Sequence, residues 1–173
     1  MNRMHAAALA AAGFLALAGC QKATDSAAFE TKAKADVRAW LAAFNAGDVD
    51  TIVALYAPDA VVMAPGNASA TGHDAIRALV QKESGVMKSA GVTLAANDDD
   101  KAAASGDLGW HSGSYVAKDA SGTVVDSGNY MEVQQNIDGK WLIIRDIWNS
   151  DRPPPAPAEA PPADAAATTP PTS

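Results

Sequence analysis

The sequence predicts an α+β domain, because helical patterns fill its first half and strand patterns fill its second. Apolar residues recur at helical spacing through residues 29–44. From Val92 onward the apolar residues alternate with a period of two, which is typical of strands with one buried face. The dipeptide Asp138-Gly139 adds a strong two-residue hairpin signal. Helices followed by antiparallel strands indicate a helical layer packed on one sheet.

The first two predicted helices are separated by a glycine. Asp25 or Ser26 can cap the start of the first helix, and Gly47 fits its end. Asp48 then caps a second, short helix that stops at Pro58. The apolar stripe of the first helix is formed by Phe29, Ala33, Val37, Trp40, Leu41 and Phe44. The inner residues expected for the second helix are Ile52, Val53, Leu55 and Tyr56.

A third helix lies between a short strand and the strand-rich half. Residues 60–64 form the strand and residues 65–67 a turn. Asp74 caps the third helix, Gly85 weakens it, and Gly91 can end it. Its inner residues are Ile76, Leu79, Val80 and Met87. The strands expected afterwards are 92–97, 107–118, 122–136 and 139–149.

The first 19 residues have the layout of a secretory signal. Arg3 precedes an apolar run over residues 6–18, which is too short to span a bilayer. The ending LAGC resembles a bacterial lipobox, so residues 1–19 would be cleaved and Cys20 would carry lipid. By resemblance to diderm lipoproteins, Gln21 rather than Asp after this cysteine favours the periplasm-facing outer membrane of a bacterial envelope. The alternative is an ordinary signal in which the Cys is accidental.

Three further segments follow the signal. Residues 20–26 form a lipidated tether, 27–151 one domain, and 152–173 a disordered tail rich in Pro and Ala. The tail is either a solvated end or a spacer or docking strip. Loss of Arg3 with the signal takes the net charge from −7 to −8. An acidic chain without a basic cluster argues against nucleic acid as a partner.

We expect no metal and no cofactor. No phosphate-binding glycine loop or nucleophile elbow occurs in the sequence. The two histidines left after signal removal, His73 and His111, lie on different predicted elements. Residues 98–100 are all Asp, but they lack the Gly and distal Glu of a calcium loop and indicate an acidic surface turn.

The domain resembles the nuclear-transport-factor-2-like superfamily, in its SnoaL-like, ketosteroid-isomerase-like branch. The segments that carry the resemblance are FNAGDVDTIVALYAPDAVVMAP, TGHDAIRALV, GSY and DGKWLIIRDIWNSD. This resemblance implies a cone: three helices on a strongly curved, mostly antiparallel sheet, with an apolar pocket between them. It also implies a homodimer through the outer face of the sheet.

The isomerase chemistry of this branch does not transfer to the chain. Alignment places the Tyr of the isomerase on Trp40, its base on Ala64 and its carboxylic acid on or near Glu132. Ala64 cannot accept a proton, so steroid isomerisation by that mechanism is not expected. Trp40 and a neutral Glu132 could still hold a ligand carbonyl.

Strand alternation gives a second candidate, Asp146. If Trp148 faces the pocket, as the resemblance implies, Asp146, Ile144 and Leu142 face it too. Asp146 is then either a general acid or base or a core group satisfied by hydrogen bonds. The other expected pocket residues are Trp110, Ser112, Ser114, Tyr130, Glu132 and Gln134, with Met63 near the mouth. The outer face would hold Trp141, Ile143, Arg145, Ile147, His111 and Tyr115.

Three functional hypotheses follow. The first is an anchored envelope protein whose pocket binds a small, largely apolar molecule. The second is an enzyme of the isomerase, cyclase or hydratase kind that uses Asp146. The third is a dimeric protein–protein module whose pocket is filled by its own side chains. An open pocket favours the first two hypotheses, and a filled one favours the third.

Overall fold

The computed structural model describes residues 25–152, and the signal segment, Cys20 and most of the tail lie outside this range. Its three helices are α1 (Ser26–Ala46), α2 (Val49–Val53) and α3 (Gly72–Ser89). The Asp25 side chain accepts hydrogen bonds from the first backbone amides of α1. Gly47 ends α1 in the left-handed conformation, at a φ of 79°. Both predicted ends of the first helix are therefore confirmed.

The second helix is shorter than expected, and the prediction for Tyr56 was wrong. Asp48 caps α2 as predicted, but Tyr56 begins strand β1 (Tyr56–Met63). Pro58 therefore lies inside a strand, where it cannot donate a ladder hydrogen bond. The pairing of β1 with the last strand accordingly shifts register between Tyr56 and Val61. A proline that looked like a helix stop marks an irregular strand.

The strands form one seven-stranded mixed sheet. The remaining strands are β2 (Ala70–Thr71), β3 (Thr93–Ala96), β4 (Lys101–Ser105), β5 (Leu108–Lys118), β6 (Val124–Ile137) and β7 (Lys140–Trp148). Their order is β2-β1-β7-β6-β5-β3, with β4 also paired to β5. Only β1 and β7 run parallel, and every other pairing is antiparallel. The α+β class and the four later strands are confirmed, whereas β2 and β4 were not anticipated.

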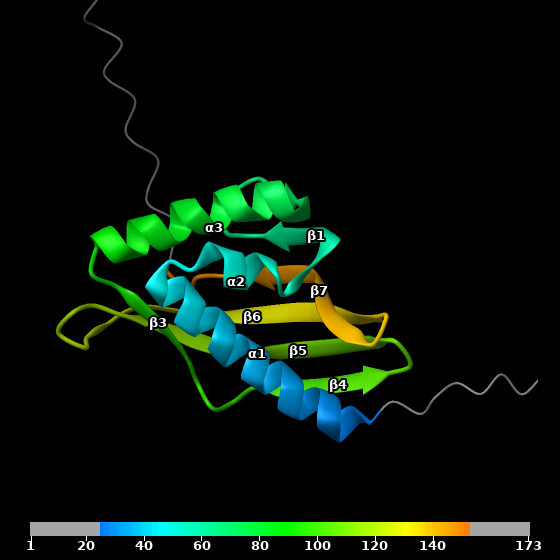
Figure 1. The fold of residues 1–173 in the computed structure, drawn as a ribbon. Helices are drawn as coiled ribbons and strands as arrows, with labels where there is room; N and C mark the ends of the chain where they lie inside the picture. The colour runs from blue at the N-terminus through cyan, green and yellow to red at the C-terminus, as the bar shows by residue number, and fades with distance from the viewer. Residues whose placement is uncertain (1–24, 153–173) are drawn as a thin grey trace, which may run out of the picture.

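The sheet is not strongly curled, contrary to the expectation from the cone shape (Figure 1). A sharp bend usually needs bulges, which break the ladder and increase the local twist. The long β5–β6 ladder runs without a shift from Leu108 to Ala117, and β6–β7 shifts once, between Val133 and Gln134. These regular ladders leave the sheet comparatively flat.

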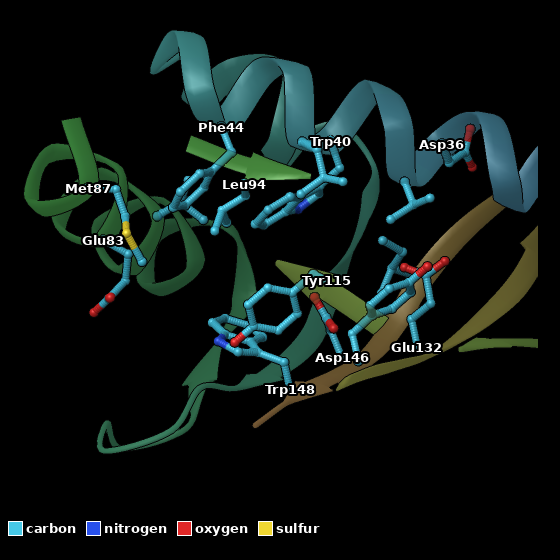
Figure 2. A pocket seen from close by; sticks show the side chains of 15 residues that line it. Asp36, Trp40, Phe44, Glu83, Met87, Leu94, Tyr115, Glu132, Asp146 and Trp148 are labelled. Carbon is cyan, nitrogen blue, oxygen red and sulfur yellow. The ribbon is translucent and has the colours of Figure 1, made fainter. Parts of the chain in front are cut away.

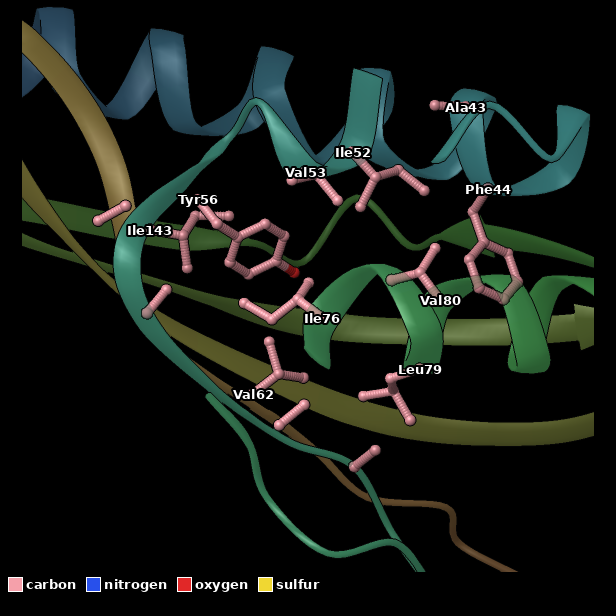
Figure 3. Close-up of a cluster of buried hydrophobic side chains, with 14 residues drawn as sticks. Ala43, Phe44, Ile52, Val53, Tyr56, Val62, Ile76, Leu79, Val80 and Ile143 are labelled. Carbon is pink, nitrogen blue, oxygen red and sulfur yellow. The ribbon is translucent and has the colours of Figure 1, made fainter. Parts of the chain in front are cut away.

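The helices cover one face of the sheet (Figure 1). Helix α1 packs on β3 and β4, while α3 packs on β1 and β2. A core cluster joins α2, α3 and β1, with Ile52, Tyr56 and Ile76 fully or almost fully buried in it (Figure 3). Within residues 25–152, no helix is long and apolar enough to cross a membrane.

Candidate functional site

A largely apolar pocket opens between α1, α3 and the sheet, with a cavity volume of about 110 Å³ (Figure 2). Trp40 and Phe44 project into it from α1, and their rings stack at 5.0 Å. Its other aromatic walls come from the sheet: Tyr115, Tyr130 and Trp148. Its aliphatic lining is Val37, Leu41, Val80, Met87, Leu94 and Ile143. Its charged lining is Asp36, Glu83, Glu132 and Asp146.

Strand register places the two inner carboxylates side by side. Glu132 on β6 pairs with Asp146 on β7, and the next inward pair is Tyr130 with Trp148. Residues directly opposite in an antiparallel pair share one face of the sheet. Glu132 is 6% exposed and Asp146 is 8% exposed, so both carboxyl groups are almost withdrawn from water.

A chain of hydrogen bonds leads from α1 to Asp146. The Trp40 indole nitrogen donates to the Tyr56 hydroxyl over 3.1 Å, and this hydroxyl donates to Asp146 Oδ2 over 2.6 Å. Burial and the negative charge of Glu132 raise the pKa of Asp146 to about 7, although the Tyr56 hydrogen bond works in the opposite direction. Burial and Asp146 together raise the pKa of Tyr56 well above its usual value, so Tyr56 remains a donor.

Glu132 belongs to a second buried network. His111 Nδ1 lies 3.1 Å from Glu132 Oε1, and His111 Nε2 lies 3.3 Å from Asp100 Oδ2. Gln134 Nε2 also donates to Glu132 Oε1, over 2.7 Å. Burial by itself disfavours the imidazolium, but the contacts with Glu132 and Asp100 outweigh it and raise the pKa of His111. The two carboxylates therefore favour the charged form of His111.

Asp100 lies at the far end of this network, on a second and more polar hollow between α1 and the β3–β4 segment. Glu132 lines the main pocket, so His111 bridges the two hollows. The acidic turn at residues 98–100 was expected to lie wholly at the surface. This prediction was wrong for Asp100, which is 6% exposed because His111 lies beneath it.

Tyr130 contributes a buried polar atom without a partner. Its hydroxyl oxygen has no hydrogen-bond partner among the described residues, and the same holds for Gln134 Oε1. The Tyr130 ring lies over Gly113, where an added Cβ would come within 2.6 Å of the hydroxyl. Only a residue without a side chain allows the ring to lie so close to β5.

The structure places five of the predicted ligand-site residues on the pocket wall. They are Trp40, Tyr130, Glu132, Asp146 and Trp148. Trp40 is not free to hold a carbonyl, because its indole N–H already donates to Tyr56. Ala64, the position of the isomerase base, is buried outside the pocket lining.

The predictions for Trp110, Ser112 and Met63 were wrong. His111 pairs with Glu132 and therefore shares its inner face, which turns Trp110 and Ser112 outward. Trp110 is 41% exposed, and Ser114 also lies on the outward-facing set of β5. Met63 pairs with Ile147, which is 46% exposed on the same outer face.

His111 and Tyr115, expected outside, belong to the inner face. Tyr115 lines the pocket and His111 is fully buried. The prediction that β5 residues alternate between two faces was correct, but the inner and outer sets were exchanged. The alternating pattern of a single strand does not determine which of its two sets of residues faces the helices.

A bulge in β7 explains why the predicted inner and outer faces were wrong for the first part of this strand. Val133 pairs with Arg145 and Gln134 with Ile143, so Ile144 is an extra residue in β7. Residues before it reverse their face. Ile143 therefore lines the pocket, while the outward positions of Arg145 and Ile147 are retained. The same reversal brings Trp141 against Phe29 of α1, at a ring distance of 4.6 Å, and removes Leu142 and Ile144 from the pocket lining.

Sequence reasoning missed Tyr56, the direct partner of Asp146. Its signal was available in the apolar run that surrounds it, because a Tyr among core residues needs a hydrogen-bond partner. In the described part of the chain, no group of three or more His, Cys, Asp or Glu residues is arranged to hold a metal ion.

Solved structures share this fold at low sequence identity. An NTF2-like protein of unknown function from Pseudomonas putida is 20% identical, with a TM-score of 0.64, and the alignment covers 72% of this chain and 87% of that one. An NTF2-like protein with a cystatin-like fold from Novosphingobium aromaticivorans is 17% identical, with a TM-score of 0.61 and coverages of 68% and 79%. A ketosteroid isomerase-like protein from Erwinia carotovora atroseptica is 20% identical, with a TM-score of 0.53 and coverages of 69% and 94%.

No curated protein matches the sequence significantly. The protein-family model for the SnoaL-like domain matches residues 37–143, which is more than half of the chain. This segment extends from the pocket side of α1 to Ile143 in β7. The resemblance seen in the sequence is thus confirmed, and the chain belongs to the SnoaL-like domain family.

Proposed function

We propose that the domain binds one small, largely apolar molecule in the pocket between α1, α3 and the sheet. The observation that carries this proposal is an open cavity whose walls are mostly aromatic and aliphatic side chains. The third sequence hypothesis required a filled pocket, so the open cavity counts against it. The volume of about 110 Å³ is below the ~150 Å³ of an engineered cavity that holds benzene. The enclosed part of the ligand is therefore no larger than about one ring.

The binding proposal is tested by mass spectrometry of small molecules that co-purify with the protein. We expect a compound of this size with wild type and with a Val124→Ser control, since Val124 is 53% exposed outside the pocket lining. A Val80→Trp variant, which fills the cavity from α3, should lose it. Empty wild-type protein in repeated preparations, or equal retention by Val80→Trp, would refute the proposal.

A second candidate function is catalysis by Asp146 as a general acid or base. The specific observation in its favour is a carboxyl group that lines the pocket, has a pKa of about 7, and is held by Tyr56 at 2.6 Å. An isomerase, cyclase or hydratase step would use such a group. Turnover of a captured ligand by wild type but not by Asp146→Asn would support it. Equal turnover by both proteins would exclude Asp146 as the acid or base.

We also propose that the chain is exported and anchored by lipid at Cys20, facing the periplasm from the outer membrane. Support comes from the LAGC ending of the apolar segment and from Gln21. Several acyl chains would give a stable anchor, at about 0.8 kcal/mol per buried CH₂. Labelled fatty acid should enter the wild-type protein and not a Cys20→Ser variant. Lack of label in the wild type would refute the anchor.

The outer sheet face supports a proposal of a homodimer. Trp110, Met131 and Ile147 are each between 41% and 47% exposed on it, around the exposed Arg145. An apolar surface of this kind commonly marks an interface. Light scattering at micromolar concentration should give a dimer mass for wild type and a monomer mass for Ile147→Asp. A wild-type monomer would refute the dimer.

A further inference from the structure

We propose that the pocket selects an organic cation, an amine or ammonium group carried on an apolar body of about one ring. This inference rests on the proposed binding function and names the chemical class of its ligand. Every charged residue that lines the pocket is acidic, and no Lys, Arg or His is among the lining residues. The walls around these acids are aromatic and aliphatic.

The four acids are not equivalent. Asp36 and Glu83 lie toward the periphery of the pocket and already have basic neighbours, Lys32 and Lys82. Glu132 and Asp146 lie together on the sheet, and no lysine or arginine within residues 25–152 forms an ion pair with either of them. The inner end of the pocket is therefore where a ligand charge is needed.

The charges around this inner end do not balance when both carboxyl groups are ionised. His111 can supply at most one positive charge, and it lies between two carboxyl groups, Asp100 and Glu132. Asp146 accepts a hydrogen bond from the Tyr56 hydroxyl and forms no ion pair with any described residue. Buried charges without an opposite charge are costly. A cation seated between Glu132 and Asp146 would remove this imbalance.

The aromatic lining also favours a cation. The faces of Trp, Tyr and Phe rings carry negative electrostatic potential, which attracts ammonium groups most strongly where water is excluded. The five aromatic residues of the lining are Trp40, Phe44, Tyr115, Tyr130 and Trp148.

Other ligand charges fit less well. An anion would approach Glu132 and Asp146 without a basic residue to receive it. A neutral carbonyl could accept a hydrogen bond from the Trp148 indole N–H, but it would leave Glu132 and Asp146 without an opposite charge. The inner end of the pocket thus combines two carboxyl groups with aromatic ring faces, which are the features that recognise a positively charged group.

The test uses three probes of one size: benzylammonium, benzyl alcohol and benzoate. Calorimetric titration of the purified full chain at neutral pH should give a dissociation constant at least tenfold lower for benzylammonium than for benzyl alcohol. Benzoate should bind most weakly. In Glu132→Gln and in Asp146→Asn the tenfold preference should fall below about threefold. Asp59→Asn, which removes an exposed carboxylate outside the pocket lining, should retain it.

The results separate this inference from the binding proposal. Benzyl alcohol or benzoate binding as tightly as benzylammonium would overturn the cation inference and leave the binding proposal standing. Binding of none of the three probes would count against both. Circular dichroism checks that each variant is folded. Asp146→Asn keeps the test decisive if Glu132→Gln loses its structure, because Glu132 also holds His111. An unchanged preference in a folded variant would overturn the inference.

Discussion

The Tyr56 hydroxyl lies 2.6 Å from Asp146 Oδ2, although the two residues are 90 positions apart in the chain. Tyr56 is the first residue of β1, and Asp146 lies near the end of β7. Both are almost completely buried, so water does not compete for this hydrogen bond. The contact joins the hydrophobic core to the pocket wall. Substitution of either residue should therefore change both the stability of the core and the properties of the pocket.

Replacement of Tyr56 by Phe should raise the pKa of Asp146 further above 7. The lost hydrogen bond favours the ionised carboxylate, so its removal favours the protonated form. We also expect a loss of about 1 to 3 kcal/mol in the free energy of unfolding, because Trp40 loses its acceptor. NMR titration of the Asp146 carboxyl carbon measures the shift. Tyr115→Phe is the control, since its hydroxyl donates to Asn149 instead, and an unchanged pKa in Tyr56→Phe would contradict the prediction.

Asp146 should make the protein less stable as the pH rises from about 4 to about 7. Its pKa is higher in the folded chain than in the unfolded one, so the folded state binds more protons over this range and loses stability as they leave. The shift corresponds to an effect on the order of 4 kcal/mol. Urea unfolding should be measured for wild type and Asp146→Asn at pH 5 and pH 8. From pH 5 to pH 8 the free energy of unfolding of the Asn variant should rise relative to that of wild type. A difference between the two proteins that does not change with pH would argue against a raised pKa.

His111→Ala should destabilise the fold by about 3 to 5 kcal/mol, because two buried carboxylates lose their shared cation. The raised pKa of His111 means that its contribution is complete below the unfolded pKa and is lost as pH rises through the folded pKa. The deficit of the Ala variant should thus be larger at pH 6 than at pH 9. His73→Ala is a useful comparison, since the His73 ring bonds to a backbone oxygen, that of Tyr56, and to no carboxylate among the described residues.

Gly113→Ala and Gly85→Ala should have opposite effects on stability. A Cβ at Gly113 would meet the Tyr130 ring and hydroxyl at 2.6 to 2.9 Å, so the ring must move, at a cost of about 1 to 3 kcal/mol. A Cβ at Gly85 meets nothing within 4 Å, and Ala stabilises a helix interior by about 0.5 to 1 kcal/mol. Thermal unfolding checks both variants. A Gly113→Ala protein as stable as wild type would show that Tyr130 can yield without cost.

The sequence predicted the elements better than it predicted their faces. Helical spacing and the caps at Asp25, Gly47 and Asp48 are local properties, and the structure confirms them. Asp146 was placed on the pocket side because the terminal Trp148 set the correct alternation for the end of β7. The candidate carboxyl group could therefore be found without coordinates.

The errors arose where distant segments decide the outcome. The face of His111 depends on its pairing with Glu132, which the pattern within β5 does not contain. The extra residue at Ile144 changes every inward position before it, although no unusual residue marks the bulge. Tyr56 gains its role from Asp146, at the other end of the domain. Period-two patterns thus predict strands, while register and bulges require the assembled sheet.

Strand β7 is synthesised last, yet it lies between β1 and β6 in the sheet. A growing chain that has reached only β6 has two separate groups of strands with unpaired edges and lacks Ile143 in its core. Pairing β1 with β7 also closes a long loop, which slows folding. The sheet therefore becomes continuous only after β7, the last strand of the domain, has been synthesised. A chain interrupted before β7 lacks the strand that joins the two groups, and it lacks Ile143, Asp146 and Trp148 of the pocket lining.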